Sequence, residues 1–265
     1  MLLDGILDTM SKKLIVGNWK MNPATLDEAK HIAGRVKRTA VSLKITEAVI
    51  CPPFPFIAAC VSRRKARNYS VGAQSVSTSE GGAHTGQVSA AMLRSIGAEY
   101  AIVGHSEERS AGDDDEIVSE KVMLTLASKM VAIVCVGESM RDDNGTYLLA
   151  IKEQIRRSLS KAPKNQADNI VIAYEPIWAI GAKEAMRPEQ IHEMSLFVKK
   201  VLSDMFGGDI AMKSRVLYGG AVNFRNAPDI MSIGKVDGLL VGRESVNITG
   251  FVELLKAIDN TKVRP

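Results

Sequence analysis

Four polar residues whose side chains can move protons or stabilise charge follow short apolar runs of the sequence. They are Asn18, Lys20, His105 and Glu175. A carboxylate that is buried away from water becomes more basic, so Glu175 is suited to remove a proton from carbon. An imidazole and an ammonium group can stabilise the oxyanion that forms next to that carbon. The set therefore predicts the enolisation of a carbonyl compound.

Glycine-bearing turns follow two further apolar runs and predict a phosphate site. One run precedes Gly219 and Gly220, and the other precedes Gly242. Because glycine has no side chain, backbone N–H groups at such turns can approach an anion closely. The predicted reaction needs no cofactor and no metal ion. The four histidines, at positions 31, 84, 105 and 192, do not have the spacing of a zinc site.

Each of these residues also has an ordinary structural interpretation. Lys20 could be an exposed lysine, His105 a hydrogen-bonded structural histidine, and Glu175 a surface carboxylate or a helix cap. Glycines are common in turns of every kind. The functional interpretation depends on their joint position, since all of them follow the end of a predicted strand. In a parallel barrel, those ends converge on one mouth.

The elements that must position these residues repeat a short apolar run followed by a longer amphipathic stretch. Most of the runs are apolar throughout, which is typical of parallel strands that are covered on both faces. The eight predicted strands are Leu14–Trp19, Ala48–Cys51, Ser70–Gln74, Tyr100–Val103, Val131–Val136, Ile170–Tyr174, Arg215–Tyr218 and Gly238–Val241.

The segments between the predicted strands have helical spacing. Leu26–Val41 and Asp114–Met130 are clear cases, and Pro188 and Pro228 fit the first turns of later helices. Repeating βα units imply right-handed crossovers and a parallel sheet. Eight such units in about 250 residues predict an α/β fold, a closed (β/α)8 barrel ringed by helices. An open doubly wound sheet would normally carry a GxGxxG turn after its first strand, and this sequence does not.

The composition fits a globular enzyme and argues against other classes. The 265 residues are 46% hydrophobic and 24% charged, which is enough to bury a core without a disulfide or a metal. The formal net charge of +4 is not gathered into a basic stripe, so we expect no nucleic-acid partner. Three cysteines without a CxxC pair are typical of reduced thiols and predict a cytoplasmic location. No apolar stretch reaches the ~20 residues of a membrane span, so we expect no membrane partner.

We expect one barrel domain over residues 12–265, preceded by a flexible N-terminal extension over residues 1–11. The start of the chain carries Asp4 and Asp8 but no cation, which does not fit a signal peptide. The longest stretch without a helical or strand pattern is Ser75–Gln87, which is long for a βα connection.

The motifs of this chain resemble those of the triosephosphate isomerase family, in the same order and over nearly the whole chain from about Lys12. The most specific is AYEPIWAIG at Ala173–Gly181. The others are GNWKMN at Gly17–Asn22, CPPFP at Cys51–Pro55, GGAHTG at Gly81–Gly86, VGHSE at Val103–Glu107, CVGE at Cys135–Glu138, YGG at Tyr218–Gly220 and LVG at Leu240–Gly242.

The resemblance implies a TIM barrel that interconverts dihydroxyacetone phosphate and D-glyceraldehyde 3-phosphate through an enediolate, in glycolysis and gluconeogenesis. By that resemblance, Glu175 shuttles the proton, His105 is the neutral electrophile, and Asn18 and Lys20 contact the oxyanion side. The implied phosphate contacts are main-chain N–H groups at Gly181, Ala221, Gly242 and Arg243. The family also implies a homodimer, with the 75–87 loop placed near the partner's active site.

The chain departs from the usual pattern of the family at the phosphate site and the lid. Ala221 and Arg243 stand where the family usually has Ser and a second Gly, and Ala182–Lys183–Glu184 replaces Thr-Gly-Lys at the lid tip. After Glu107 the usual two arginines are replaced by Glu108 and Arg109, and the next segment is one residue shorter. No proton-transfer group is lost, and Tyr218 keeps another lid contact of the family. We therefore expect slower turnover than is usual for the family, not a different reaction.

Two other functions stay open at this point. A sister isomerase of a four-carbon ketose phosphate would use the same base and electrophile in a roomier pocket, which Ala221 would suit. A barrel that binds sugar phosphates without turnover is the other alternative, although the retention of Asn18, Lys20, His105 and Glu175 argues against it.

Overall fold

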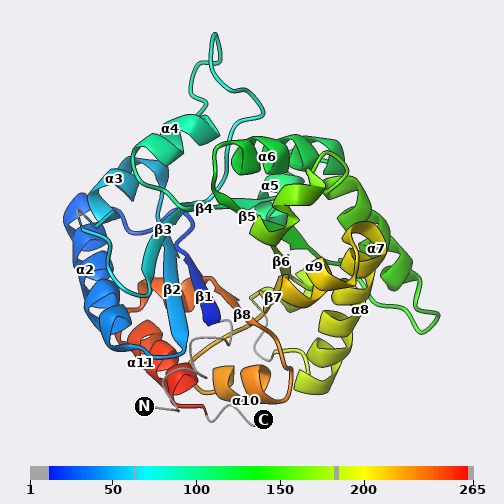
Figure 1. Cartoon of the computed structure of the whole chain (residues 1–265). Helices are drawn as coiled ribbons and strands as arrows, with labels where there is room; N and C mark the ends of the chain where they lie inside the picture. Colours follow the sequence, from blue (N-terminus) through cyan, green and yellow to red (C-terminus); the bar gives the residue numbers. More distant parts are fainter. Residues whose placement is uncertain (1–11, 63, 182–184, 262–265) are drawn as a thin grey trace.

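The computed structural model describes residues 12–62, 64–181 and 185–261. Its eight strands pair in parallel in sequence order, and β8 pairs with β1, so the sheet closes into a barrel. Figure 1 looks onto this ring of strands, with the helices outside it. The predicted (β/α)8 fold is therefore confirmed. The predictions for residues 1–11 and for Ala182–Lys183–Glu184 lie outside the described residues.

The strands have the predicted bounds in five cases out of eight. They are β1 Lys13–Asn18, β2 Thr46–Cys51, β3 Tyr69–Ala73, β4 Tyr100–Val103, β5 Val131–Val136, β6 Ile170–Tyr174, β7 Arg215–Tyr218 and β8 Gly238–Val241. The bounds predicted for the first three strands were wrong by one or two residues.

The polar residues at these strand ends explain the three errors. β1 ends before Trp19 because Lys20 turns into the left-handed region with a φ of 52°. β2 begins earlier than predicted because Thr46, although polar, is fully buried and pairs with Lys13. β3 ends before Gln74, whose side-chain amide donates 2.8 Å hydrogen bonds to backbone carbonyl oxygens outside its own strand.

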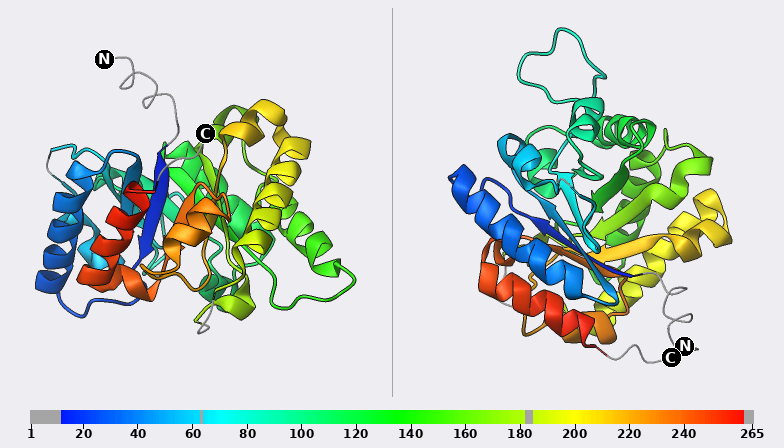
Figure 2. Two further views of the ribbon diagram at one scale, coloured as in Figure 1. Left: turned by 90° about the horizontal axis from the view of Figure 1, so that it is seen from below. Right: turned by 60° about the vertical axis from the view of Figure 1, so that its left-hand side comes forward.

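The helices form the outer layer of the barrel (Figures 1 and 2). They are α2 Leu26–Ser42, α3 Ile57–Cys60, α4 Ala90–Ser95, α5 Ser106–Ser110, α6 Asp115–Ala127, α7 Thr146–Ser158, α8 Pro188–Phe206, α9 Gly208–Lys213, α10 Ala227–Ser232 and α11 Ile248–Asp259. Four 3-10 turns complete the described elements: η1 Phe54–Phe56, η2 Lys164–Asn169, η3 Ile177–Ala179 and η4 Arg243–Val246.

Local capping determines where these helices begin and end. Thr25 and Glu28 form a reciprocal capping box at the start of α2. Asp114 is the N-cap of α6, and its side chain accepts hydrogen bonds from the backbone N–H groups of residues 116 and 117. The helix therefore begins at Asp115, one residue later than predicted. The same helix ends at Ala127 rather than Met130, because Lys129 has a φ of 58°. Pro188 opens α8, as predicted.

The core has two layers that the strands separate. Residues such as Leu14, Val16 and Ile133 form a cluster inside the barrel, whereas alternate residues such as Ile15 belong to a larger cluster shared with the helices. This alternation is the normal packing of a small closed barrel. Because apolar side chains fill the interior of the barrel, polar functional residues can gather only at the ends of the strands.

The connection between β3 and α4 leaves the compact body of the molecule. It contains no helix or strand over residues 74–89, and residues 81–87 are all exposed. Figures 1 and 2 show it projecting beyond the ring of helices. The ends of this connection pack against the barrel, since Val76, Ser77 and Ser89 are buried, whereas residues 81–87 have little of their own barrel to contact. No helix in the described part of the chain is long and apolar enough to cross a bilayer.

Candidate active site

The structure brings all of the site residues predicted from the sequence to one cavity of about 500 Å³. It lies at the carboxyl ends of the strands, where parallel barrels carry their sites. Its lining includes Asn18, Lys20, His105, Glu175, Gly181, Ala221, Gly242 and Arg243. These residues follow β1, β4, β6, β7 and β8, so five separate strands build the site.

Glu175 is a buried carboxylate next to an imidazole. Its side chain is 5% exposed, and Oε1 lies 3.4 Å from Nε2 of His105. Oε2 is buried and accepts no hydrogen bond from the described residues. Burial raises the pKa of Glu175 above its usual 4.5, while the neighbouring His105, Cys135 and Lys20 oppose this shift. A carboxylate in these surroundings is a stronger base than one in water.

Two glycines on the neighbouring strands make room for Glu175. A Cβ added at Gly137, after β5, would lie 1.9 Å from the carbonyl oxygen of Glu175. A Cβ added at Gly219, after β7, would lie 2.6 Å from Cγ of Glu175. Side chains at these two positions would therefore displace the carboxylate or its backbone. Gly219, the first glycine of YGG, thus makes room for the Glu175 side chain as well as forming the turn.

His105 is held by the start of α5 in a defined tautomer. It is the N-cap residue of that helix, and its Nδ1 accepts the backbone N–H of Glu107 at 3.2 Å. An imidazole that accepts a hydrogen bond at Nδ1 is neutral and carries its proton on Nε2. The nitrogen near Glu175 is therefore a hydrogen-bond donor. A neutral donor at this position suits it to hold a developing oxyanion.

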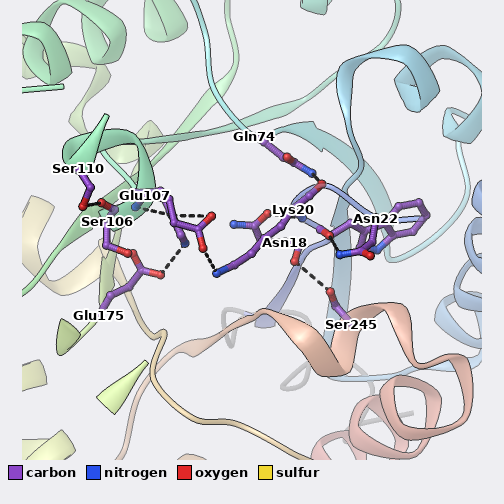
Figure 3. Close-up of polar contacts among 11 residues, drawn as sticks. Asn18, Lys20, Asn22, Gln74, Ser106, Glu107, Ser110, Glu175 and Ser245 are labelled. Atoms are coloured by element: carbon purple, nitrogen blue, oxygen red, sulfur yellow. Dashed lines mark hydrogen bonds and ion pairs between the residues drawn. The ribbon is translucent and has the colours of Figure 1, made fainter. Parts of the chain in front are cut away.

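Lys20 reaches the cavity from an unusual backbone conformation. Its left-handed backbone is supported on both sides: Asn18 Oδ1 accepts the Lys20 N–H at 3.0 Å, and Gln74 donates to the Lys20 carbonyl at 2.8 Å. Such strain persists only where neighbouring groups fix it, and it is common at functional sites. Asn18 is itself buried, and its backbone carbonyl oxygen lies 3.3 Å from the hydroxyl oxygen of Ser245. Figure 3 shows these contacts around Lys20.

The Lys20 ammonium is paired with Glu107. The two groups are 2.5 Å apart, and Figure 3 shows them directed toward each other across the site. Although partial burial opposes it, the hydrogen bond and charge of Lys20 lower the pKa of Glu107. This carboxylate is therefore a fixed anion that offsets much of the lysine's charge. The partners are 87 residues apart in sequence, so no local pattern could have indicated the pair.

The side chain of Arg109 forms hydrogen bonds at the carboxyl end of β4. Its guanidinium donates to the Gly104 carbonyl at 2.9 Å and to the Ser158 hydroxyl at 3.1 Å, and it pairs with Asp115 at 2.7 Å. Gly104 directly precedes His105 in the chain. The arginine retained at this departure from the family pattern therefore supports the strand end that carries the imidazole.

A second cluster joins the segment after β6 to the loop after β5. The buried Glu138 accepts hydrogen bonds from Trp178 Nε1 at 3.0 Å and from the hydroxyl of Tyr174 at 2.8 Å. Arg141 pairs with Glu138 at 2.8 Å and lies over the ring of Trp178. Tyr218 accepts the backbone N–H of Met186 at 3.2 Å. Trp178 and Met186, which lie on either side of residues 182–184 in the sequence, are thus both bonded to other parts of the barrel.

The part of the chain that the structure describes contains no group of three or more His, Cys, Asp or Glu side chains that could hold a metal ion. The cavity instead brings together the carboxylate of Glu175, the imidazole of His105 and the ammonium group of Lys20, with backbone at glycine turns. This set fits proton transfer next to a carbonyl group in a phosphorylated compound.

The comparisons with known proteins agree with this geometry. The family model described as triosephosphate isomerase matches residues 13–258. Among curated relatives, the triosephosphate isomerase of Endomicrobium trichonymphae is 39% identical over 249 residues, covering 93% of this chain and 99% of that protein. The triosephosphate isomerase of Moorella thermoacetica is 37% identical (93% and 98% covered), and that of Rhodopirellula baltica is 38% identical (94% and 98% covered). With its barrel, its cavity and matches of this length, the chain belongs to the triosephosphate isomerase family.

Proposed function

We propose that this chain interconverts dihydroxyacetone phosphate and D-glyceraldehyde 3-phosphate, with Glu175 as the base. The observation that carries the proposal is the buried carboxylate of Glu175, 3.4 Å from Nε2 of a neutral imidazole in the shared cavity. Family membership supplies the reaction, which places the chain in glycolysis and gluconeogenesis. A cytoplasmic location is supported by its three cysteines, all buried and free of disulfides.

The proposed reaction moves one proton between adjacent carbons. Glu175 takes a proton from the hydroxymethyl carbon of the ketose, and the C–H electron pair forms the double bond of an enediolate. His105 donates a hydrogen bond from Nε2 to the oxygen that gains charge, and Lys20 adds positive charge nearby. The proton of the hydroxyl on the first carbon passes to the oxygen on the second, a transfer for which the His105 imidazole is the available relay. Glu175 then returns the carbon-bound proton to the second carbon, which gives the aldose. Glu175 is protonated only in the intermediate, so the complete cycle leaves the enzyme unchanged.

The phosphate of the substrate is held, in this proposal, by main-chain N–H groups at Gly181, Ala221, Gly242 and Arg243. All four positions line the cavity. Holding the group that does not react restricts the carbonyl end to one orientation against Glu175, which is how positioning accelerates a reaction.

A coupled assay tests this function directly. We expect turnover of dihydroxyacetone phosphate with an efficiency well above that for a tetrulose phosphate. The reverse preference would indicate the four-carbon isomerase. Binding of both compounds without turnover would indicate a sugar-phosphate-binding barrel.

The pH dependence should reveal the environment of Glu175. The base acts only when it is ionised, so kcat/KM should fall about tenfold per pH unit below its pKa. Because burial raises that pKa, the acid limb should lie above pH 4.5, the usual value for glutamate. The substrate's phosphate group also titrates with pH. Measuring the inhibition constant of inorganic phosphate over the same pH range separates the effect of phosphate titration on binding from the ionisation of Glu175. An acid limb at or below pH 4.5 would contradict a buried base.

We also propose that the chain forms a homodimer through the loop at residues 75–87. The loop projects from its own barrel with residues 81–87 exposed, as expected of a segment that packs against a second copy. Gln74, where the loop begins, donates a hydrogen bond to the backbone carbonyl of Lys20. Met21, which follows Lys20 in the sequence, is 94% exposed. A dimer at this position would cover that apolar side chain and would lie beside the active site.

Light scattering should therefore give the mass of a dimer at micromolar concentration. A variant in which residues 78–86 are replaced by a short Gly-Ser turn should be monomeric and much less active, because the site would lose its neighbouring surface. A wild-type monomer of full activity would contradict the proposal. Circular dichroism of the variant controls for loss of the barrel.

A further inference from the structure

Arg243 is a cationic residue of the catalytic cavity's lining. It is exposed, it follows β8, and it lines the same cavity as Glu175 and His105. The ion pairs found among residues 12–62, 64–181 and 185–261 do not include it, whereas Lys20, the other cation of the lining, is paired with Glu107 at 2.5 Å. Of the two cationic residues that line the cavity, Arg243 is therefore the one that forms no ion pair with a carboxylate of the described residues.

The cavity needs such a charge to accept a phosphate ester. A phosphate monoester carries about −1.5 to −2 charges at pH 7. Glu175 and Glu244 also line the cavity, and Glu107 offsets the charge of Lys20. With Glu107 counted, three carboxylates stand against two cations, and without Arg243 they would stand against Lys20 alone. A substrate anion would then meet repulsion that backbone N–H groups alone would have to overcome.

The backbone that carries Arg243 is well anchored beside Lys20. A Cβ added at Gly242 would lie 3.8 Å from Cε of Lys20, so the turn after β8 adjoins that side chain. Ser245, which is fully buried, donates its hydroxyl to the Gly242 carbonyl at 2.7 Å and its N–H to the same oxygen at 2.8 Å. The turn is therefore fixed, and Arg243 starts from a defined position at the cavity edge.

We infer that the guanidinium of Arg243 itself binds the phosphate of the substrate, in addition to the backbone at this turn. A guanidinium offers several N–H donors in a planar fork that matches two phosphate oxygens. It also adds donors on a cavity wall where the methyl side chain of Ala221 offers none. The inference rests on the proposed function, because it names the group of the triose phosphate that this side chain takes. It makes Arg243 a determinant of specificity for dianionic phosphate esters.

The test compares Arg243→Gln with Arg243→Lys and with a matched control. Gln removes the charge but keeps a polar side chain, and Lys keeps the charge without the fork. Arg225→Gln is the control, since Arg225 is also exposed and lies over the ring of Phe224 outside the lining of the cavity. For Arg243→Gln we expect KM for dihydroxyacetone phosphate, and the inhibition constant of inorganic phosphate, to rise about tenfold. Arg243→Lys should fall in between, with kcat changed less than about threefold in both variants.

The outcomes separate this inference from the proposed function. If KM and the inhibition constant in Arg243→Gln match those of Arg225→Gln, or if they fall below wild type, the side chain does not bind phosphate. If the wild-type protein does not turn over triose phosphates, the proposed function fails instead. In that case calorimetric titration of wild type and Arg243→Gln with inorganic phosphate still decides whether Arg243 binds the anion. Equal affinities would overturn the inference.

Discussion

Replacing Glu175 by Gln should lower kcat by at least about a hundredfold while the barrel stays folded. The change preserves the size of the side chain and removes the group that accepts the proton. No other carboxylate of the lining is placed to substitute for it: Glu244 bonds Asn247 at 3.2 Å, and Glu107, nearby, is engaged by Lys20. Turnover in the coupled assay measures the effect.

Hydrogen exchange makes this prediction specific to proton transfer. In heavy water, wild-type enzyme should introduce deuterium into the substrate, whereas Glu175→Gln should introduce almost none. Glu253→Gln is a suitable control, because Glu253 is exposed on α11. Near wild-type turnover in Glu175→Gln, with exchange intact, would show that another group is the base.

Replacing His105 by Ala should lower kcat on the order of a hundredfold or more, which corresponds to about 3 kcal/mol of transition-state stabilisation. The imidazole is 6% exposed and presents Nε2 to the carboxylate of Glu175. Its loss removes the donor for the oxyanion and leaves the N–H of Glu107 without its partner. KM should change much less than kcat, because the donor is needed mainly when charge develops.

The melting temperature distinguishes this role from a purely structural one. A histidine that only supported the fold would, when removed, lower the melting temperature but leave kcat of the folded fraction nearly unchanged. His105→Gln should recover part of the rate if its amide can donate near the former Nε2 position. His31→Ala, at an exposed position on α2, provides the control for loss of an imidazole.

The barrel could be predicted from the sequence because its strands are buried on both faces. The five strands from Tyr100–Val103 onward are dominated by apolar residues, and their bounds were predicted correctly. The error at the start of β2 occurred because polar residues belong to the sheet there. Glu47 lies within β2 because it accepts the Tyr100 hydroxyl at 2.9 Å and approaches Arg215 at 3.6 Å. Such partners come from distant strands, so a local pattern cannot reveal them.

The positions of the site residues could be predicted for a different reason. A rule of topology, that the strand ends of a parallel barrel share one mouth, converts positions in sequence into neighbours in space. The rule places His105 and Glu175 near each other but says nothing of their atoms. The tautomer of His105 depends on the N–H of Glu107, and the pKa of Glu175 depends on how deeply it is buried. The tautomer and the pKa both depend on how the surrounding residues pack in three dimensions.

The clusters around the site were not predicted. Arg141 contacts Glu138, Tyr174 and Trp178 at once, and Arg109 joins the ends of two strands to α6 and α7. In the sequence each is one arginine in a polar stretch, a pattern that normally indicates a solvated surface. Their roles depend on the loops that surround them, and loop conformation is set by tertiary contacts.

The pairing of β8 with β1 has a consequence for how the protein is made. The chain leaves the ribosome from its N-terminus, so Lys20, His105 and Glu175 have all been synthesised before β8. Until residues 238–241 pair with Leu14–Gly17, the sheet is open. The turn that carries Arg243 cannot pack beside Lys20 before that pairing forms. A nascent chain therefore holds every proton-transfer group while its cavity is still unbuilt. Activity should begin only when the last strand docks on the first, which makes turnover a direct reporter of completed folding.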